Sequence, residues 1–178
     1  MSKRQKVEVD WISMITAAEE GRFDDIPPNV YARHRATIHR IAADRRMRYQ
    51  PPSLDWLVHE WIYGPDAAAP IVEGAFRKSI DKWWDRYADE EVVIVEGVEK
   101  KHKHLAHEFK QWGDLHPFRC SVRRKDGPCI RPRRVIVVSQ WPIDEIWADD
   151  AMMQASMHWR FMETYMGPAP STPLTPTP

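Results

Sequence analysis

Two short apolar runs constrain the fold of this chain more than any other feature of its sequence. They span Glu91 to Val95 and Val135 to Val138, and β-branched residues dominate both. Each run is short enough for a strand, and its apolar residues are too continuous for a strand with one solvent-exposed face. Strands that are buried on two faces are typical of a sheet with covering layers on both sides. The sequence therefore predicts an α/β fold in which both runs are buried strands.

Polar residues follow each run at its carboxyl end. Glu96 comes directly after the first run, and Ser139 and Gln140 come directly after the second. In an open α/β sheet, ligands bind at the edge where the strands end. Glu96 and Gln140 are therefore candidate site residues, and one helix and one basic hairpin are expected between the two strands.

The composition fits one globular domain with a real core and modest tails. Of the 178 residues, 43% are hydrophobic and 29% are charged, as in ordinary globular proteins. The 26 basic residues balance the 26 acidic ones, so any nucleic-acid site must come from local clustering of charge. No apolar run approaches the length of a membrane span, and we expect a soluble protein with no membrane partner.

Local clustering of positive charge occurs in the expected hairpin. The stretch from Arg119 to Arg134 contains a single acidic residue, Asp126. It contains seven basic residues: Arg119, Arg123, Arg124, Lys125, Arg131, Arg133 and Arg134. Cations on a narrow turn, with Asp126 and Gly127 to reverse the chain, suit a grip on phosphates. The alternative is a solvated loop. No aromatic residue lies at the tip, so binding should be salt-sensitive and nearly blind to sequence.

Three other groups of residues have simple interpretations. Cys120 and Cys129 flank the hairpin, and with no signal peptide visible we expect thiols rather than a disulfide. His102, His104 and His107 fit a surface helix better than a metal site, since no further ligand completes a tetrahedral set. The tryptophans of the central stretch are expected to pack in the core rather than stack on bases: Trp83, Trp84, Trp112 and Trp147.

Two helices are expected before the sheet. Asp10 is a plausible N-cap for a helix that runs through Glu20 and stops at Gly21. The Pro27–Pro28 pair opens a second helix over about 29–47, because proline fits the first turn of a helix. The second helix is rich in arginine, and its exposed side is either a solvated face or a contact for a nucleic-acid backbone or a neighbouring subunit.

Several blocks of the sequence resemble one protein family. The stretch from Lys82 to Trp147 is similar, in the order and spacing of its motifs, to the helicase domain of replication-associated (Rep) proteins of circular single-stranded DNA viruses. The matching blocks are Lys82-Trp83-Trp84-Asp85, Gln111-Trp112, His116-Pro117-Phe118, Ile130-Arg131-Pro132, Val137-Val138-Ser139-Gln140 and Ile143-Asp144-Glu145-Ile146-Trp147. With Trp61-Ile62-Tyr63-Gly64-Pro65 upstream, and an extension to about Phe161, the resemblance covers roughly two thirds of the chain.

The resemblance implies a superfamily 3 helicase with an AAA+-like P-loop NTPase core of three layers and a mostly parallel sheet. It assigns 10–50 to a helical region that takes part in oligomerisation and 54–165 to the ATPase core. The polar, basic start at 1–9 and the proline- and threonine-rich tail at 166–178 are expected to be disordered, because they lack the hydrophobic residues to fold. The implied activity is ATP-driven unwinding of DNA in rolling-circle replication, with ATP and Mg²⁺ as cofactors. The implied partners are single-stranded DNA and other subunits of a ring, in the host nucleus. No histidine pair or Tyr-x-x-Lys motif of the family's nicking domain precedes the core, so we expect no cleavage of DNA by tyrosine chemistry.

The resemblance also assigns roles to single residues. Gly64 and Pro65 stand where the phosphate-binding loop begins, and Glu96 stands where a carboxylate holds Mg²⁺. Gln140 corresponds to the sensor amide and Arg160 to the arginine finger, although a strand-end amide and a surface arginine are the plain alternatives. The hairpin residues of the family that grip single-stranded DNA correspond to Arg123, Arg124 and Lys125, with Arg131 and Arg133 in the same basic stretch.

The phosphate loop itself departs from the family pattern. A Walker A loop places Gly-Lys-Ser/Thr where this chain has Ala69, Pro70 and Ile71, and proline offers no N–H to a phosphate. The connection is also too short for the helix that follows such a loop. Lys78 with Ser79 is a remote candidate for a displaced phosphate ligand.

The second motif of the nucleotide site is also incomplete, because Gly97 replaces the second carboxylate after Glu96 and Glu99 is out of register. We therefore expect weak or absent ATP and Mg²⁺ binding and no useful hydrolysis. The alternatives to a helicase are a non-enzymatic fragment that binds single-stranded nucleic acid or poisons a ring of intact Rep, and a decayed product without activity.

Overall fold

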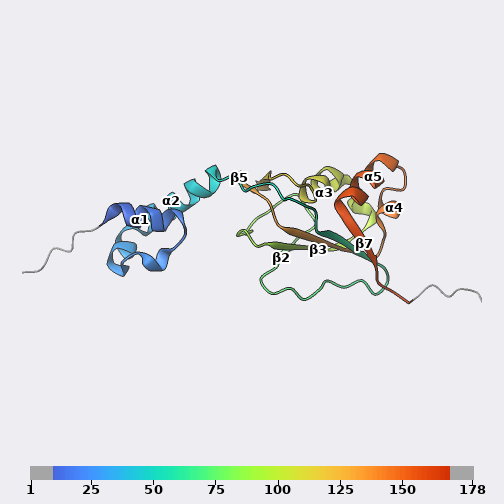
Figure 1. The fold of residues 1–178 in the computed structure, drawn as a ribbon, viewed down its shortest axis with the longest axis horizontal. Coiled ribbons are helices and arrows are strands. Elements are labelled where there is room, and N and C mark those ends of the chain that lie inside the picture. The colour runs from blue at the N-terminus through green and yellow to red at the C-terminus, as the bar shows by residue number, and fades with distance from the viewer. Residues whose placement is uncertain (1–9, 169–178) are drawn as a thin grey trace, which may run out of the picture. The chain divides into compact units, whose positions relative to one another are not determined.

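The computed structural model describes residues 10–168, and it divides the chain into two compact units, Met1–Tyr49 and Gln50–Pro178. Figure 1 draws both units as ribbons. The expected disorder of residues 1–9 and 169–178 falls outside the described residues. Met166 itself is described, and its N–H donates to the carbonyl of Tyr63.

The first unit consists of two helices joined by a short 3₁₀ helix, and both helices begin where the sequence predicts. In α1 (Trp11–Glu19), the Asp10 carboxylate accepts the N–H groups of Ile12 and Ser13 at 3.1 and 3.2 Å. After η1 (Phe23–Asp25), α2 (Pro28–Arg48) begins with proline in its first turn and is kinked at His34. The core between them is small and consists of Ala17, Ala18, Ile26, Val30 and Ile38.

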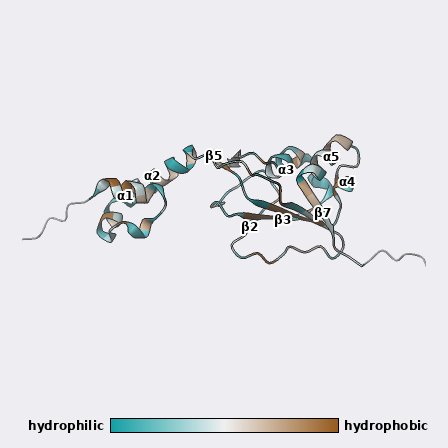
Figure 2. Cartoon of the chain, viewed as in Figure 1, coloured by the Kyte–Doolittle hydropathy of each residue, from teal (hydrophilic) through white to brown (hydrophobic). Residues whose placement is uncertain are grey.

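The second unit is built on a five-stranded parallel sheet, which confirms the α/β fold. Its strands are β1 (His59–Tyr63), β2 (Phe76–Lys78), β3 (Val92–Val98), β6 (Arg134–Ser139) and β7 (Phe161–Tyr165), in the order β2-β3-β6-β1-β7. The two apolar runs of the sequence are β3 and β6, which pair with each other, and both lie inside the sheet. The central strands are brown in Figure 2, as expected for strands buried on two faces.

The chain covers the two faces of the sheet unequally. It moves first from β1 out to the edge strand β2, and then returns through β3 and β6 to the other edge at β7. Crossover connections between parallel strands are right-handed. The reversal of direction therefore places the β1–β2 connection on one face and all later connections on the other.

The face with the later connections holds the main core. It is covered by η2 (Lys100–Leu105), α3 (Ala106–Trp112), α4 (Ile143–Ile146) and α5 (Ala151–Arg160), together with the loop 79–91. Trp84, Trp112 and Trp147 are buried there, as expected, whereas Trp83 is only half-buried. Trp61 from β1 is fully buried in the same core and contacts Phe109, Trp147 and Phe161 edge-on or tilted.

The opposite face has no helix over it in the described chain. The connection 64–75 runs beneath the sheet as turns and extended chain, below the strands in Figure 1. Ala67, Ala69, Val72 and Ala75 of this connection pack against Ile62, Ile94, Ile136 and Val138 of the sheet. The connection is as short as the sequence indicates, and the helix that follows a phosphate loop is absent from it.

A separate antiparallel hairpin is inserted between α3 and β6. It consists of β4 (Phe118–Val122) and β5 (Lys125–Ile130), as the sequence predicts between the two buried strands. None of the helices in the described part of the chain is long and apolar enough to span a bilayer.

Candidate nucleotide and nucleic-acid sites

The parallel sheet gathers three of the predicted site residues at one edge. Gly64 follows β1, Glu96 lies near the end of β3, and Gln140 follows β6. Since β3, β6 and β1 are neighbours, all three residues lie at the carboxyl edge of adjacent strands. The connections after β1 and β6 leave toward opposite faces, and this is the arrangement that opens a ligand crevice in α/β sheets.

The start of the expected phosphate loop is blocked by the chain that follows β7. Gly64 has a φ of +124°, and a Cβ placed there would lie 2.1 Å from the carbonyl oxygen of Met166. The Met166 N–H in turn donates to the Tyr63 carbonyl at 2.6 Å. Glycine is therefore required at this position for close packing against residue 166.

The backbone N–H groups at the start of the loop are not free to hold phosphates. Pro65 has none, Asp66 N–H donates to Met166 O at 3.2 Å, and Ala67 N–H donates to Gly64 O at 3.1 Å. A phosphate cradle needs several N–H groups that converge on empty space, usually at the start of a helix. Residues 65–67 provide neither.

Glu96 is not arranged as a magnesium ligand. Its carboxylate forms an ion pair with Arg77 on the neighbouring strand β2, and the strand bulges at the next residue, Gly97, which has a φ of +78°. Glu99 caps η2 and binds Lys101 at 3.0 Å, so it does not replace the missing second carboxylate. Among the described residues, no group of three or more His, Cys, Asp or Glu side chains could hold a metal ion.

Gln140 is exposed at the end of β6, and its side chain has no hydrogen bond to a described residue. The preceding Ser139 is buried and holds the strand end, because its hydroxyl donates to Val98 O at 2.8 Å and accepts Trp141 N–H at 2.9 Å. An amide at this edge can contact a ligand.

Arg160 lies at the opposite edge of the sheet, at the end of α5. Its guanidinium donates to Lys110 O at 3.0 Å and to the hydroxyl and carbonyl of Ser156, and it forms an ion pair with Asp114 at 2.7 Å. Burial raises the pKa of Asp114, but the hydrogen bond from Arg160 and the backbone N–H groups that Asp114 accepts lower it further, and the net pKa is below 3.8. In this chain Arg160 joins α5 to the end of α3.

Lys78 is buried in the main core and is not available to a ligand. Its ammonium donates to the carbonyls of the next loop, namely Ser79 at 3.1 Å, Asp81 at 2.6 Å and Trp83 at 2.8 Å. Burial lowers the pKa of Lys78 from 10.5 to about 8, and the charges of Asp81 and Asp85 oppose this shift. The suggestion of a displaced phosphate ligand therefore does not suit the position of this lysine.

The hairpin reverses three residues earlier than the sequence suggests. Val122 pairs with Lys125, so Arg123 and Arg124 form the turn, and Arg124 has a φ of +65°. The expectation that Asp126 and Gly127 reverse the chain is wrong, because both lie within β5. Gly127 is needed there for packing, since a Cβ would lie 2.1 Å from Cys120 O.

The tip of the hairpin is anchored to the loop that Lys78 organises. Arg123 N–H donates to Asp85 Oδ1 at 3.1 Å. The guanidinium of Arg123 lies 3.6 Å from the Asp85 carboxylate and 3.7 Å from that of Asp81. Arg124 is exposed beside it. The side chain of Lys125 is outside the described part of the structure.

The other basic residues of this stretch are divided between packing and solvent. Arg131 is largely buried and donates to four carbonyls at the end of α3 and beyond, those of Gln111, Trp112, Asp114 and His116. Burial lowers the pKa of Arg131 to about 10. Arg133 is exposed and lies 3.9 Å from Glu91. Arg131 thus serves as a helix C-cap rather than as a surface cation.

The cysteines lie in the hairpin, and His102 and His104 lie in η2. Cys120 is buried, Cys129 is partly buried, and both are free thiols. His102 belongs to the cap of η2, and His104 Nδ1 lies 2.9 Å from Lys101 O. Neither histidine is placed with a further ligand.

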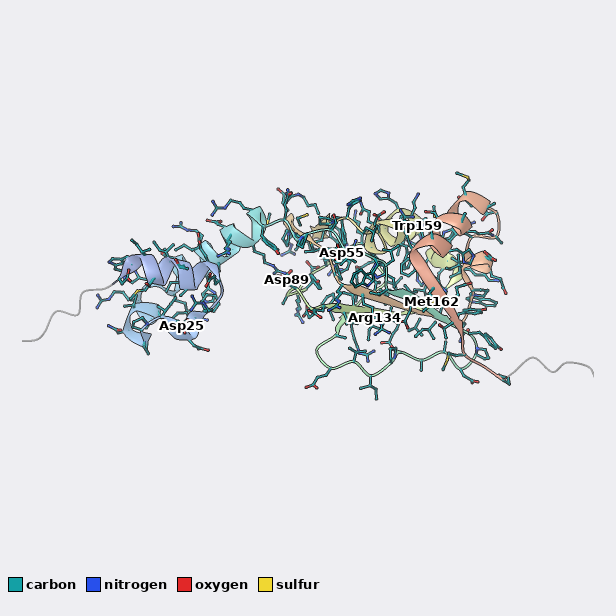
Figure 3. All side chains as sticks on the ribbon, in the orientation of Figure 1. Asp25, Asp55, Asp89, Arg134, Trp159 and Met162 are labelled. Carbon is teal, nitrogen blue, oxygen red and sulfur yellow. The ribbon has the colours of Figure 1, made fainter. Side chains whose placement is uncertain are left out.

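A cavity of about 780 Å³ lies at the amino edge of the sheet, away from Gly64, Glu96 and Gln140. Arg134, Trp159 and Met162, labelled in Figure 3, line this cavity, and Arg134 forms an ion pair with Glu60 across two strands. This cavity could not be predicted from the sequence, because its lining comes from the starts of four strands and the end of α5.

Comparisons with known proteins do not identify the family. No protein-family model and no curated protein matches this sequence.

Proposed function

We propose that this chain is a Rep-type superfamily 3 helicase core that has lost ATP hydrolysis and acts as a non-enzymatic module that binds single-stranded DNA. The observation that carries the proposal is the blocked loop at Gly64, where proline, internal hydrogen bonds and the Met166 carbonyl replace a phosphate cradle. The parallel sheet supports the resemblance to the family, because it brings the three motif ends to adjacent strands.

Phosphoryl transfer depends on positioning and on stabilising charge, and both are weakened in this chain. Catalysis needs backbone N–H groups and a lysine on the phosphates, a metal ion, and a group that orients the attacking water. Here the lysine position is Pro70 and the surviving carboxylate, Glu96, is paired with Arg77. Loss of several such interactions together removes most of the transition-state stabilisation.

The binding half of the proposal rests on the hairpin. Arg123 and Arg124 present two cations at a two-residue turn, and Arg124 is exposed. Phosphate contacts of this kind give affinity without sequence information and weaken as salt rises. Assembly with copies of itself or with intact Rep in a host nucleus, including the poisoning of an active ring, is part of the same proposal.

A phosphate-release assay in the presence of single-stranded DNA tests the loss of hydrolysis, with an intact Rep helicase domain as positive control. We expect no release above background. A titration of fluorescent ATP with Mg²⁺ gives an independent reading, for which we expect no saturable binding. Turnover comparable to that of the control would refute the proposal and favour the alternative, ATP-driven unwinding.

The DNA-binding half is tested by titrating the full chain against a fluorescent oligonucleotide over a salt series. Replacement of Arg123, Arg124 and Lys125 by Ala should weaken binding and flatten the salt dependence. Unchanged affinity in this variant would remove the hairpin from the binding site.

A further inference from the structure

Most basic side chains of the hairpin stretch that the structure describes already have partners within the protein. Arg123 is held by two carboxylates, Arg131 caps α3, and Arg119 donates to Gly127 O at 2.9 Å. By contrast, α2 carries six arginines against one acid, Asp44, along 21 residues. They are Arg33, Arg35, Arg40, Arg45, Arg46 and Arg48.

Half of these arginines have a local structural explanation. Arg45, Arg46 and Arg48 lie in the last turn of α2, where positive charge is favourable beside the negative end of the helix dipole. Arg45 also lies 3.7 Å from the Glu19 carboxylate of α1, and Arg48 Nε donates to Asp44 O at 3.2 Å.

The other three arginines lack such an explanation. Arg33, Arg35 and Arg40 are exposed, and none has a hydrogen bond or ion pair with another residue in the range 10–168. They lie in the first two thirds of the helix, where the dipole offers no compensation. A solvent-exposed helix face ordinarily carries charged residues of both signs, which stabilise each other at spacings of three and four residues. The N-terminal two thirds of α2 carries cations alone.

The spacing of these cations suits one kind of partner. From Arg35 to Arg40, beyond the kink at His34, the helix advances about 7.5 Å, at about 1.5 Å per residue. Each strand of double-stranded DNA carries a phosphate about every 3.4 Å along the axis, so this distance spans about two phosphates. The nearest aromatic ring on α2, Tyr31, is half-buried and its hydroxyl lies 2.8 Å from His39 Nε2, so it is not free to stack on a base.

From these observations we propose that Arg33, Arg35 and Arg40 of α2 form a second contact for the phosphate backbone of a nucleic acid, in a different unit from the hairpin. The contact is electrostatic and carries no base readout. It extends the proposed function to a second surface but does not require the hairpin to bind.

The test uses the full chain and fluorescence anisotropy with a labelled oligothymidylate, titrated over a series of NaCl concentrations. The variant replaces Arg33, Arg35 and Arg40 with Gln. Each lost contact with a single strand lowers the slope of log K against log salt by about 0.7, so the triple variant should lower the slope by about 2. Its affinity at low salt should fall by more than tenfold.

The matched control removes the same net charge from cations that are already paired. Lys100, Lys101 and Lys103 bind Glu145, Glu99 and Asp149 at 2.8 to 3.0 Å, and their triple Gln variant should keep the wild-type slope. Replacing the three arginines with Lys keeps the charge and should also keep the slope, which guards against a folding defect. Equal slopes and affinities in the α2 and control variants would overturn the proposal, as would an equal loss in the Lys and Gln variants.

Two further comparisons separate this inference from the proposed hairpin grip. A loss of affinity in the hairpin variant alone would leave the proposed function intact and overturn the α2 contact. A loss of affinity in the α2 variant alone would support the α2 contact and remove the hairpin from the proposed function. Displacement of the oligonucleotide by polyglutamate at equal charge concentration would assign α2 to an acidic protein partner and overturn the nucleic-acid assignment.

Discussion

The ammonium of Lys78 lies 4.5 Å from the ring centroid of Trp112, inside the main core of the sheet unit. The ring of Trp84 lies on another side at 5.1 Å, and three backbone carbonyls of the loop 79–83 receive its hydrogen bonds. The side chain is fully buried. The loop 79–85 is therefore folded around one buried charge. Asp81 and Asp85 of this loop bind Arg123 at the tip of the hairpin.

Lys78 should give the fold a specific dependence on alkaline pH. Its pKa is about 8 in the folded chain against 10.5 for an ordinary lysine, chiefly because burial penalises the charged form. Between these values the unfolded chain binds more protons, so the contribution of Lys78 to the free energy of unfolding rises with pH. At about 1.4 kcal/mol per pKa unit, the rise is about 3 kcal/mol at most.

The measurement is urea unfolding of the wild type and of Lys78→Met at pH 7.5 and pH 10. The difference in free energy between the two proteins cancels the titration of other groups, and it should shift in favour of the wild type at the higher pH. A difference that does not change with pH would show that Lys78 titrates normally, contrary to its burial.

His59 should make the fold sensitive to acid. It is buried, and its Nδ1 accepts the Val135 N–H at 3.0 Å. Burial, and then the charge of Arg131, lower the pKa of His59 from 6.5 to about 4. The stability that it contributes is present above pH 6.5 and is lost as pH falls through 4, by up to about 3 kcal/mol.

The variant His59→Gln provides the comparison, because the glutamine amide oxygen can accept the same N–H without gaining a charge. The free energy of unfolding of His59→Gln should fall less than that of the wild type between pH 7 and pH 4. Parallel decreases in the two proteins would mean that other groups cause the acid sensitivity.

The sequence predicted the features that depend on local patterns. The buried strands β3 and β6 follow from continuous β-branched runs, and the starts of α1 and α2 follow from Asp10 and Pro28. The carboxyl-edge positions of Gly64, Glu96 and Gln140 follow from the parallel order of these strands.

The sequence could not predict which side chains are already engaged by distant parts of the chain. Arg131 was a candidate contact for DNA, and Arg160 a candidate arginine finger or a surface arginine; in the structure both guanidinium groups donate to carbonyls at the end of α3. The partner of Gly64 is Met166, about a hundred residues away in sequence. Such contacts depend on the order of the strands, and no periodicity or spacing in the sequence encodes them.

Replacement of Gly64 by Ala should be strongly destabilising. A methyl group there would overlap the Met166 carbonyl, and the φ of +124° is one that residues with a Cβ rarely adopt. Overpacking and backbone strain together should cost about 2 to 4 kcal/mol. Thermal or urea unfolding measures this cost.

Gly74→Ala is the matched control, since Gly74 has a φ of +71° but no heavy atom within 4 Å of the added Cβ. It should cost about 1 kcal/mol, from strain alone. If both variants lose the same stability, the Met166 carbonyl does not pack against Gly64 in solution, and the phosphate loop is not blocked at this point.

Asp85→Asn should bind single-stranded DNA more tightly than the wild type. The carboxylate of Asp85 lies 3.6 Å from the Arg123 guanidinium and competes with phosphate for it, whereas Asp85 Oδ1 also accepts the Arg123 N–H. Asparagine keeps this acceptor and removes the charge, so the tip stays in place while the cation is released. A gain of severalfold is expected at low salt, and it should vanish near 1 M salt, where the Debye length falls to about 3 Å.

A gain in affinity is informative because misfolding rarely produces one. Asp149→Asn is the control, since Asp149 is an exposed carboxylate paired with Lys103 at 3.0 Å and its loss changes the net charge equally. The control should leave the affinity near that of the wild type, because overall charge acts weakly beyond a Debye length. Weaker binding by Asp85→Asn would mean that anchoring of the hairpin tip to Asp85 matters more for DNA binding than release of the Arg123 charge. Equal gains in affinity in both variants would mean that the effect comes from net charge alone.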